Sequence, residues 1–129
     1  MPANYAFGKT VKSSYDDTIR KATEALAAEG FGVLTTIDVA ATLKKKLNID
    51  VPAYRILGAC NPQFAHRVLE AEPEIGTLLP CNVVVRRQGA KTAVDIMDPL
   101  AVMDLVGKPD VAKIAGEVRG RLDRVLAAL

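Results

Sequence analysis

The segment 83–97 constrains the fold of this chain more than any other. Residues 83–85 are three consecutive valines, typical of a strand buried on both faces. Residues 86–91 (Arg-Arg-Gln-Gly-Ala-Lys) carry turn-forming glycine, and residues 92–97 then return with apolar and polar side chains alternating around Asp95. This pattern predicts a β-hairpin. The sheet therefore contains at least one antiparallel pair of strands.

The rest of the chain alternates between short strands and helices. Side chains that cap helices, often followed by proline, precede most of the helical segments. The spacing of the apolar residues predicts strands over 5–11, 31–37 and 54–60, the second of them half buried on one face. It predicts helices from Ser14 to Gly30, from Asp38 to Asn48, from Asn61 toward residue 72, from Asp98 to Gly107, and from Pro109 onward.

These elements predict an α+β fold with two layers. Amphipathic helices need one apolar face of the sheet to cover, and 129 residues are enough for one domain over residues 1–129. The segment 73–80 is expected to be a loop, but Ile75, Leu78 and Leu79 make it unusually apolar. Such a loop packs either on the core or on another subunit.

Charge and hydropathy exclude several classes of function. A formal net charge of +2, no Trp, three Tyr and three Phe argue against nucleic-acid binding. The apolar stretches are far shorter than the ~20 residues that span a bilayer, so no membrane association is predicted. Residues 1–5 show no signal-peptide pattern, which predicts a cytoplasmic protein with reduced cysteines.

Two cysteines form the most unusual local feature. Cys60 and Cys81 each lie at the end of a predicted strand, and each is followed by asparagine, Asn61 or Asn82. If the two strands are neighbours, both thiols approach one end of the sheet. The pair then binds a soft metal, cycles as a dithiol or presents a thiolate to an electrophile. The alternative is that both thiols are inert and buried, and that Asn61 only caps a helix.

The metal ligands available to this chain are few. Zinc needs four ligands, and His66, the one histidine, is expected on a helix surface. Copper(I) accepts sulfur ligands, so Cys60, Cys81 and Met97 are the candidate metal site. No other cofactor is predicted.

Two charged residues complete the set of candidates. Arg55 precedes Cys60 in the same strand, where a guanidinium could lower a thiol pKa or bind an anion. The ordinary alternative is an ion pair of Arg55 with one of three carboxylates, those of Asp95, Asp98 and Glu72. Asp98 is a candidate ligand-binding residue that is also explained as a helix cap.

Several segments together resemble one family. They are 54–62 (Tyr-Arg-Ile-Leu-Gly-Ala-Cys-Asn-Pro), 78–85 (Leu-Leu-Pro-Cys-Asn-Val-Val-Val), 97–99 (Met-Asp-Pro), 30–35 (Gly-Phe-Gly-Val-Leu-Thr) and 37–39 (Ile-Asp-Val). The chain resembles the bacterial and archaeal "domain of unknown function 302" proteins over nearly its whole length. The resemblance implies a curved, mainly antiparallel sheet of about five strands with helices on one face, similar in outline to TATA-binding-protein-like folds. It also implies a homodimer, and no established activity.

The leading hypothesis is a non-enzymatic, homodimeric protein that binds a small ligand or a soft metal. Its candidate binding residues are Arg55, Cys60, Asn61, Cys81, Asn82 and Asp98. The alternative is a thiol-dependent redox or transfer enzyme that uses Cys60 or Cys81. A third hypothesis is a structural or interaction protein with the segment 73–80 in its interface.

Overall fold

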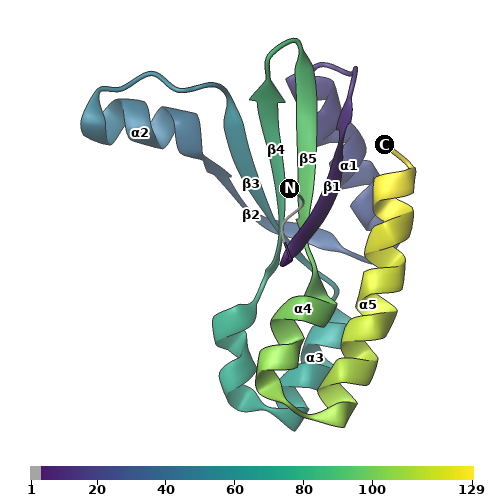
Figure 1. Ribbon diagram of the computed structural model, residues 1–129. Coiled ribbons are helices and arrows are strands. Elements are labelled where there is room, and N and C mark those ends of the chain that lie inside the picture. The colour runs from purple at the N-terminus through teal and green to yellow at the C-terminus, as the bar shows by residue number, and fades with distance from the viewer. Residues whose placement is uncertain (1–3) are drawn as a thin grey trace.

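A computed structural model describes residues 4–129 and shows one curved, open sheet of five strands. The strand order is β1-β5-β4-β3-β2, and every neighbouring pair is antiparallel (Figure 1). The bounds are β1 Ala6–Val11, β2 Gly32–Asp38, β3 Tyr54–Cys60, β4 Cys81–Gln88 and β5 Lys91–Met97. The predicted hairpin is therefore β4–β5, and the predicted α+β class is confirmed.

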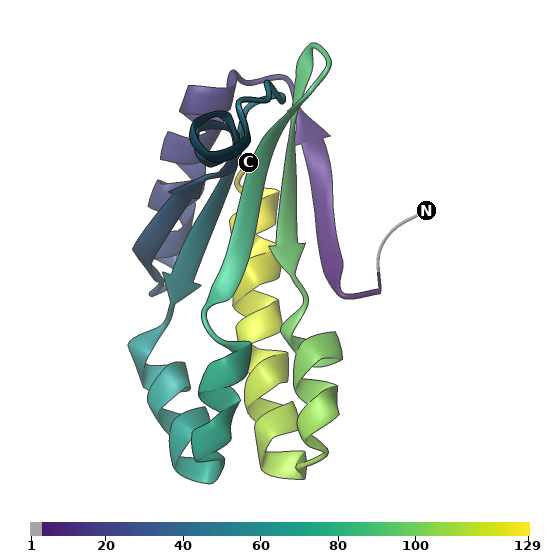
Figure 2. The same cartoon turned by 90° about the vertical axis from the view of Figure 1, so that its left-hand side faces the viewer.

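Two helices cover one face of this sheet. Helix α1 (Tyr15–Ala28) and helix α5 (Pro109–Ala127) lie behind the strands in Figure 2. The alternation along each strand sends every second side chain toward them, and Leu57, Val83 and Ile96 are fully buried there. The apolar spacing that predicts a helix from Pro109 onward lies on the buried side of α5, where Val111, Ile114, Val118, Leu122 and Val125 are buried.

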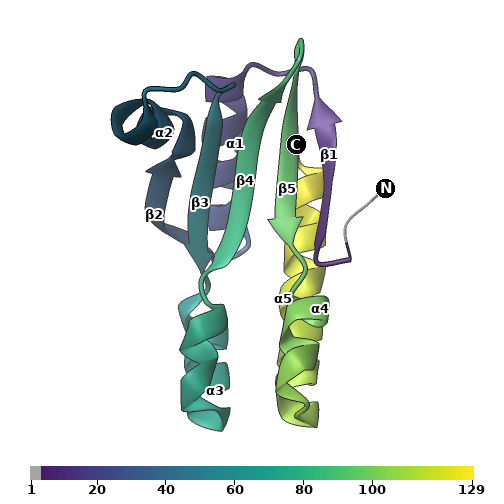
Figure 3. The same cartoon turned by 60° about the vertical axis from the view of Figure 1, so that its left-hand side comes forward.

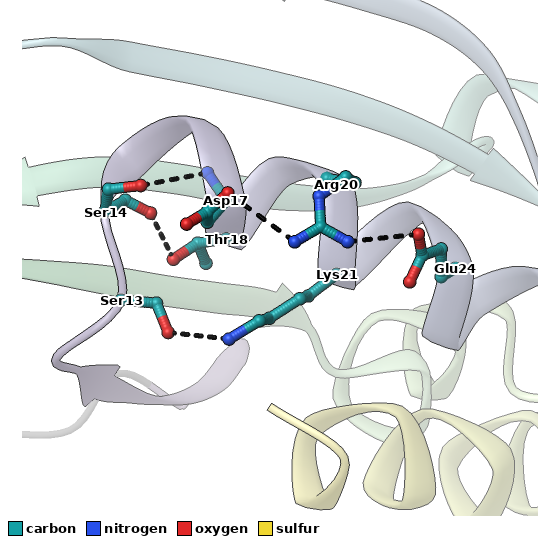
Figure 4. A network of polar contacts seen from close by, with 7 residues as sticks. All are labelled: Ser13, Ser14, Asp17, Thr18, Arg20, Lys21 and Glu24. Atoms are coloured by element: carbon teal, nitrogen blue, oxygen red, sulfur yellow. Dashed lines mark hydrogen bonds and ion pairs between the residues drawn. The ribbon is translucent and has the colours of Figure 1, made fainter.

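Helix α1 begins as its sequence predicts. The hydroxyl of Ser14 accepts a hydrogen bond from the backbone N–H of Asp17 (3.2 Å), and the hydroxyl of Thr18 donates to the carbonyl of Ser14 (2.7 Å; Figure 4). The first bond satisfies a backbone N–H that the start of a helix leaves without a partner, whereas the carbonyl of Ser14 also accepts from the backbone N–H of Thr18 (2.9 Å). Gly30 ends the segment with a positive φ of 86°, a conformation that glycine adopts without steric cost.

A second group of helices extends beyond one end of the sheet (Figure 3). It contains α3 (Pro62–Ala71), the 3₁₀ turn η1 (Pro73–Leu78), α4 (Pro99–Met103), the 3₁₀ turn η2 (Asp104–Val106) and the first turns of α5. The segment 73–80, expected as a loop, is mostly this 3₁₀ turn. Ile75 in it is 2% exposed and belongs to the core of its own chain. Packing on this core, the first of the two alternatives for the segment, is therefore what the structure shows.

Among the α-helices of the described residues, α2 (Val39–Leu47) is the one without a buried residue. Asp38 caps it as predicted, accepting from the backbone N–H of Ala41 at 2.9 Å, but none of its residues is buried. The strand before it also departs from prediction: a register shift between Val33 and Thr35 breaks the expected alternation, so Ile37 is 48% exposed. Strand β2 is therefore not half buried along one face.

Two sequence expectations concern the wider setting of the chain. Within the described residues, no helix combines the length and apolar character that crossing a membrane requires. The absence of a signal peptide is predicted from residues 1–5, of which residues 1–3 lie outside the part that the structure describes.

Candidate functional site

An apolar cavity lies where the sheet meets the second group of helices. Its volume is about 340 Å³, and its walls come from β2, β3, the start of β4, and helices α3, α4 and α5. Both cysteines, Cys60 and Cys81, line it. The thiols of Cys60 and Cys81 therefore share one cavity.

The antiparallel register brings the two cysteines together. Cys60 is the last residue of β3 and Cys81 is the first residue of β4. In the β3–β4 ladder Cys81 lies opposite Ala59, the neighbour of Cys60. Because neighbouring antiparallel strands place the end of one beside the start of the next, residues twenty-one positions apart in the sequence share one end of the sheet.

No charged side chain is found among the described residues that line the cavity. Asn61, the most polar of them, already uses its side chain: its Oδ1 accepts from the backbone N–H of Phe64 (3.4 Å), and its Nδ2 donates to the carbonyl of Glu29 (3.5 Å). The aromatic and aliphatic wall includes Phe31, Phe64 and Met103. The cavity therefore favours an uncharged occupant.

Burial keeps both thiols protonated. Burial raises the pKa of Cys81 from its ordinary 9.0 to about 11, and the negative charge that Cys60 would carry adds to the rise. Burial also raises the pKa of Cys60. The thiolate is the nucleophilic form, so at neutral pH neither sulfur has the lowered pKa of a reactive cysteine.

Arg55, a predicted site residue, lies far from the cysteines along β3. Its Nη2 pairs with Oδ2 of Asp38 at 3.3 Å, at the end of β3 that adjoins α2. All three partners proposed from sequence were therefore wrong. Asp95 pairs with Arg86 (2.8 Å), Asp98 with Arg119 (2.7 Å) and Glu72 with Lys108 (2.7 Å).

Three further candidates also lie outside the cavity wall. Asn82 and Met97 line a groove on the open face of the sheet, because alternation along a strand turns each of them away from its inward-facing neighbour. Asp98 caps α4 by accepting from the backbone N–H of Leu100 (2.9 Å), as the cap interpretation predicts. Of the six candidate binding residues, the structure brings Cys60, Asn61 and Cys81 to one cavity.

The metal candidates divide in the same way. Met97 belongs to the groove, whereas Met103 of α4 is the methionine that lines the cavity with the two cysteines. Among the described residues, no three His, Cys, Asp or Glu side chains gather as a metal site. His66 lies on the surface with 73% of its side chain exposed, beside Glu70.

Comparison with known proteins places this fold in a family. A family model described as "domain of unknown function DUF302" matches residues 7–129. The chain belongs to the DUF302 family. The structure is similar to the crystal structure of the uncharacterized conserved protein DUF302 from Bacillus stearothermophilus, with 31% identity, 98% of each chain covered and a TM-score of 0.91. No curated protein matches the chain.

Membership of the DUF302 family agrees with the segments of the sequence that resemble it. The description of the family does not specify an activity. Other residues of the cavity were not found from sequence. Phe64 and Met103 occupy ordinary apolar positions of helices α3 and α4, where the spacing that marks a core residue is the same as the spacing that marks a cavity wall.

Proposed function

We propose that this DUF302 protein binds a small, uncharged and largely apolar molecule in the cavity beside Cys60 and Cys81. The observation that carries the proposal is a partly open apolar cavity with both thiols in its wall and no charged lining residue among those described. An ionised ligand would lose its hydration there without gaining a counter-charge.

The size and access of the cavity fit this role. Ligand pockets commonly measure roughly 300–1,000 Å³, and this one holds about 340 Å³. Leu34 of β2 and Leu69 of α3 line it while remaining 68% and 38% exposed, so they mark the side on which a ligand enters. The thiols supply polarisable sulfur and weak hydrogen-bond donors inside.

The thiol-enzyme alternative receives less support. A nucleophilic cysteine needs a lowered pKa or an adjacent base, whereas burial raises the pKa of both cysteines here. No histidine or carboxylate stands among the described residues that line the cavity. A binding protein is therefore the function we propose.

The test uses two related fluorescent probes and one pair of variants. Neutral phenylnaphthylamine should bind with fluorescence enhancement, and its anionic sulfonate analogue should bind at least tenfold more weakly. Ala65→Phe, at the partly exposed wall of the cavity, should raise the dissociation constant of the neutral probe about tenfold or more. Ala101→Phe, at a partly exposed position outside the wall, is the matched control. Equal affinity for both probes, or an equal loss in both variants, would overturn the proposal.

A soft metal is a second candidate for the same cavity. Cys60, Cys81 and Met103 line it together, which gives three sulfur donors for a monovalent metal such as copper(I). Both thiols must lose their protons to bind, so affinity should rise with pH.

Titration with silver(I), a redox-stable stand-in for copper(I), tests this candidate by calorimetry. We expect one ion per chain, with Cys81→Ser abolishing the binding and Met103→Leu weakening it. Met97→Leu is the control, because Met97 lines the groove instead. If Met97→Leu weakens binding and Met103→Leu does not, the site is wrong.

A further inference from the structure

A β-bulge in β2 places two consecutive residues in the wall of the cavity. Strand β2 lies at the edge of the sheet and pairs with β3 (Figure 3). In that ladder Val33 lies opposite Ala59 and Thr35 lies opposite Gly58, so Leu34 between them has no partner. Consecutive residues of a regular strand point to opposite faces, whereas Leu34 and Thr35 both line the cavity. Bulges commonly redirect a side chain beside a functional site.

The side chain of Thr35 occupies space that Gly58 leaves free. A Cβ atom at Gly58 would overlap Oγ1 of Thr35 and would lie 3.0 Å from Cγ of Pro80. Gly58 is buried, and its neighbours Thr35 and Pro80 both line the cavity. Because glycine has no side chain, the hydroxyl of Thr35 can lie directly over the backbone of β3. The bulge and the glycine together therefore place Thr35 in the cavity wall.

The hydroxyl of Thr35 is a polar group of this wall that is free to bind a ligand. Within the described part of the chain its side chain makes no hydrogen bond, whereas five other threonine hydroxyls each donate to a backbone carbonyl. These five belong to Thr18, Thr23, Thr42, Thr77 and Thr92. In the same wall, the side chain of Asn61 already makes two hydrogen bonds, and the two thiols are weak donors.

Thr35 lies on the side of the cavity by which a ligand enters. Its neighbour Leu34 is 68% exposed, and Thr35 is exposed as well. Elsewhere the wall is apolar and buried, as at Phe31 and Met103, which are 3% and 5% exposed. A ligand that enters with its apolar end first brings its last atoms beside the hydroxyl of Thr35 and covers it. A wholly apolar ligand would leave this hydroxyl without a partner, which costs binding free energy.

Building on the proposed function, we infer that the ligand is a neutral alcohol or phenol, with its hydroxyl bound by Thr35 and its apolar body inside the cavity. A threonine hydroxyl both donates and accepts, so it pairs with a ligand hydroxyl in either direction. The described wall has no charged residue, which disfavours a carboxylic acid or an amine, because both are ionised at neutral pH. Thr35 then determines which uncharged molecules are preferred, while the apolar wall supplies most of the affinity.

Equilibrium dialysis with two probes of the same shape tests the preference for a hydroxyl. Naphthol carries a hydroxyl where the corresponding methylnaphthalene carries a methyl group, and both are uncharged at neutral pH. Thr35→Val removes the threonine hydroxyl with little change of shape. We expect this variant to weaken the binding of naphthol relative to methylnaphthalene by about three- to tenfold, the range of one neutral hydrogen bond. Comparing the two probes cancels any general effect of the substitution on the cavity.

Two further variants are the controls. Thr35→Ser keeps the hydroxyl, so the ratio of the two dissociation constants should stay within about twofold of the wild-type ratio. Thr36→Val removes the hydroxyl of the next residue, which is exposed and is not among the residues that line the cavity. This variant should also leave the ratio unchanged.

The possible results distinguish the role of Thr35 from the proposed function. Methylnaphthalene binding with an unchanged ratio in Thr35→Val would show that Thr35 does not select the ligand, although the cavity still binds apolar molecules. An equal change in Thr36→Val would show the same. If neither probe binds the wild-type chain, the proposed function and the preference for a hydroxyl are both overturned.

Discussion

Strand β3 connects two helices that are capped in the same way but are buried to different extents. Helix α2 lies before β3 and is capped by Asp38, while α3 follows β3 and is capped by Asn61. Both caps accept a hydrogen bond from a backbone N–H three residues on. Yet α3 buries Phe64 and Val68, and α2 buries nothing. A cap starts a helix, but its contribution to the stability of the fold depends on what the helix packs against.

The same difference in burial holds for the apolar surfaces at the two ends of β3. At the α3 end, helices α3, α4 and α5 and the sheet surround a partly open apolar cavity of about 340 Å³, within the usual size range of small-molecule sites. At the α2 end, the apolar side chains of Leu47, Ile49 and Val51 remain 63%, 44% and 36% exposed.

Truncating one apolar side chain in α3 and one in α2 should give the largest difference between the two helices in the free energy of unfolding. Phe64→Ala removes a ring that is 9% exposed and contacts the guanidinium groups of Arg67 and Arg121. We expect it to lower the free energy of unfolding by about 3–5 kcal/mol. Leu47→Ala should change it by less than about 0.5 kcal/mol, because Leu47 is 63% exposed. Urea unfolding measures both losses. Similar losses in both variants would contradict the comparison.

The thiols of the cavity should react slowly. A pKa of about 11 in place of 9.0 leaves Cys81 with about a hundredfold less thiolate near neutral pH. We therefore expect alkylation of Cys81 by iodoacetamide to be at least a hundredfold slower than alkylation in the urea-unfolded chain, as followed by mass spectrometry.

The same shift predicts how stability depends on pH. Because the folded pKa lies above the ordinary value, the contribution of Cys81 is complete below about pH 9 and is lost as pH rises through about 11. Cys81→Ala should reduce this alkaline loss.

Fast labelling of Cys81 by iodoacetamide in the folded protein at neutral pH would argue against a protonated, buried thiol.

Removing the two helix caps, Asn61 and Asp38, should give the smallest difference in the free energy of unfolding. Asn61 is 8% exposed and makes a second hydrogen bond, to the carbonyl of Glu29, so Asn61→Ala should cost about 2 kcal/mol. Asp38 also makes a second interaction, the ion pair with Arg55, but its side chain is 44% exposed and water screens this pair. Asp38→Ala should therefore cost about 1 kcal/mol or less. Urea titrations of both variants measure the two losses. A larger loss from Asp38→Ala would show that the α2 end contributes more than its burial indicates.

The sequence predicted that Cys60 and Cys81 approach one end of the sheet if their strands are neighbours, and the structure confirms this placement. Cys60 and Cys81 share a cavity because β3 and β4 are adjacent and antiparallel, as the hairpin and strand patterns allowed. Prediction from sequence failed for Met97, because the inward or outward direction of a residue at the end of β5 depends on the register of the whole sheet. It failed for the partners of Arg55, because β2 and α2 bring Asp38 to it across the sheet.

The sequence by itself determined where helices and strands begin and end, since caps, prolines, glycines and apolar spacing act over a few residues. It also determined the family, through segments that span nearly the whole chain. The tertiary structure alone decided which apolar surfaces are covered. It forms the cavity at one end of β3 and leaves helix α2 without a buried residue at the other. Burial depends on contacts between residues distant in the chain, and local patterns do not encode their geometry.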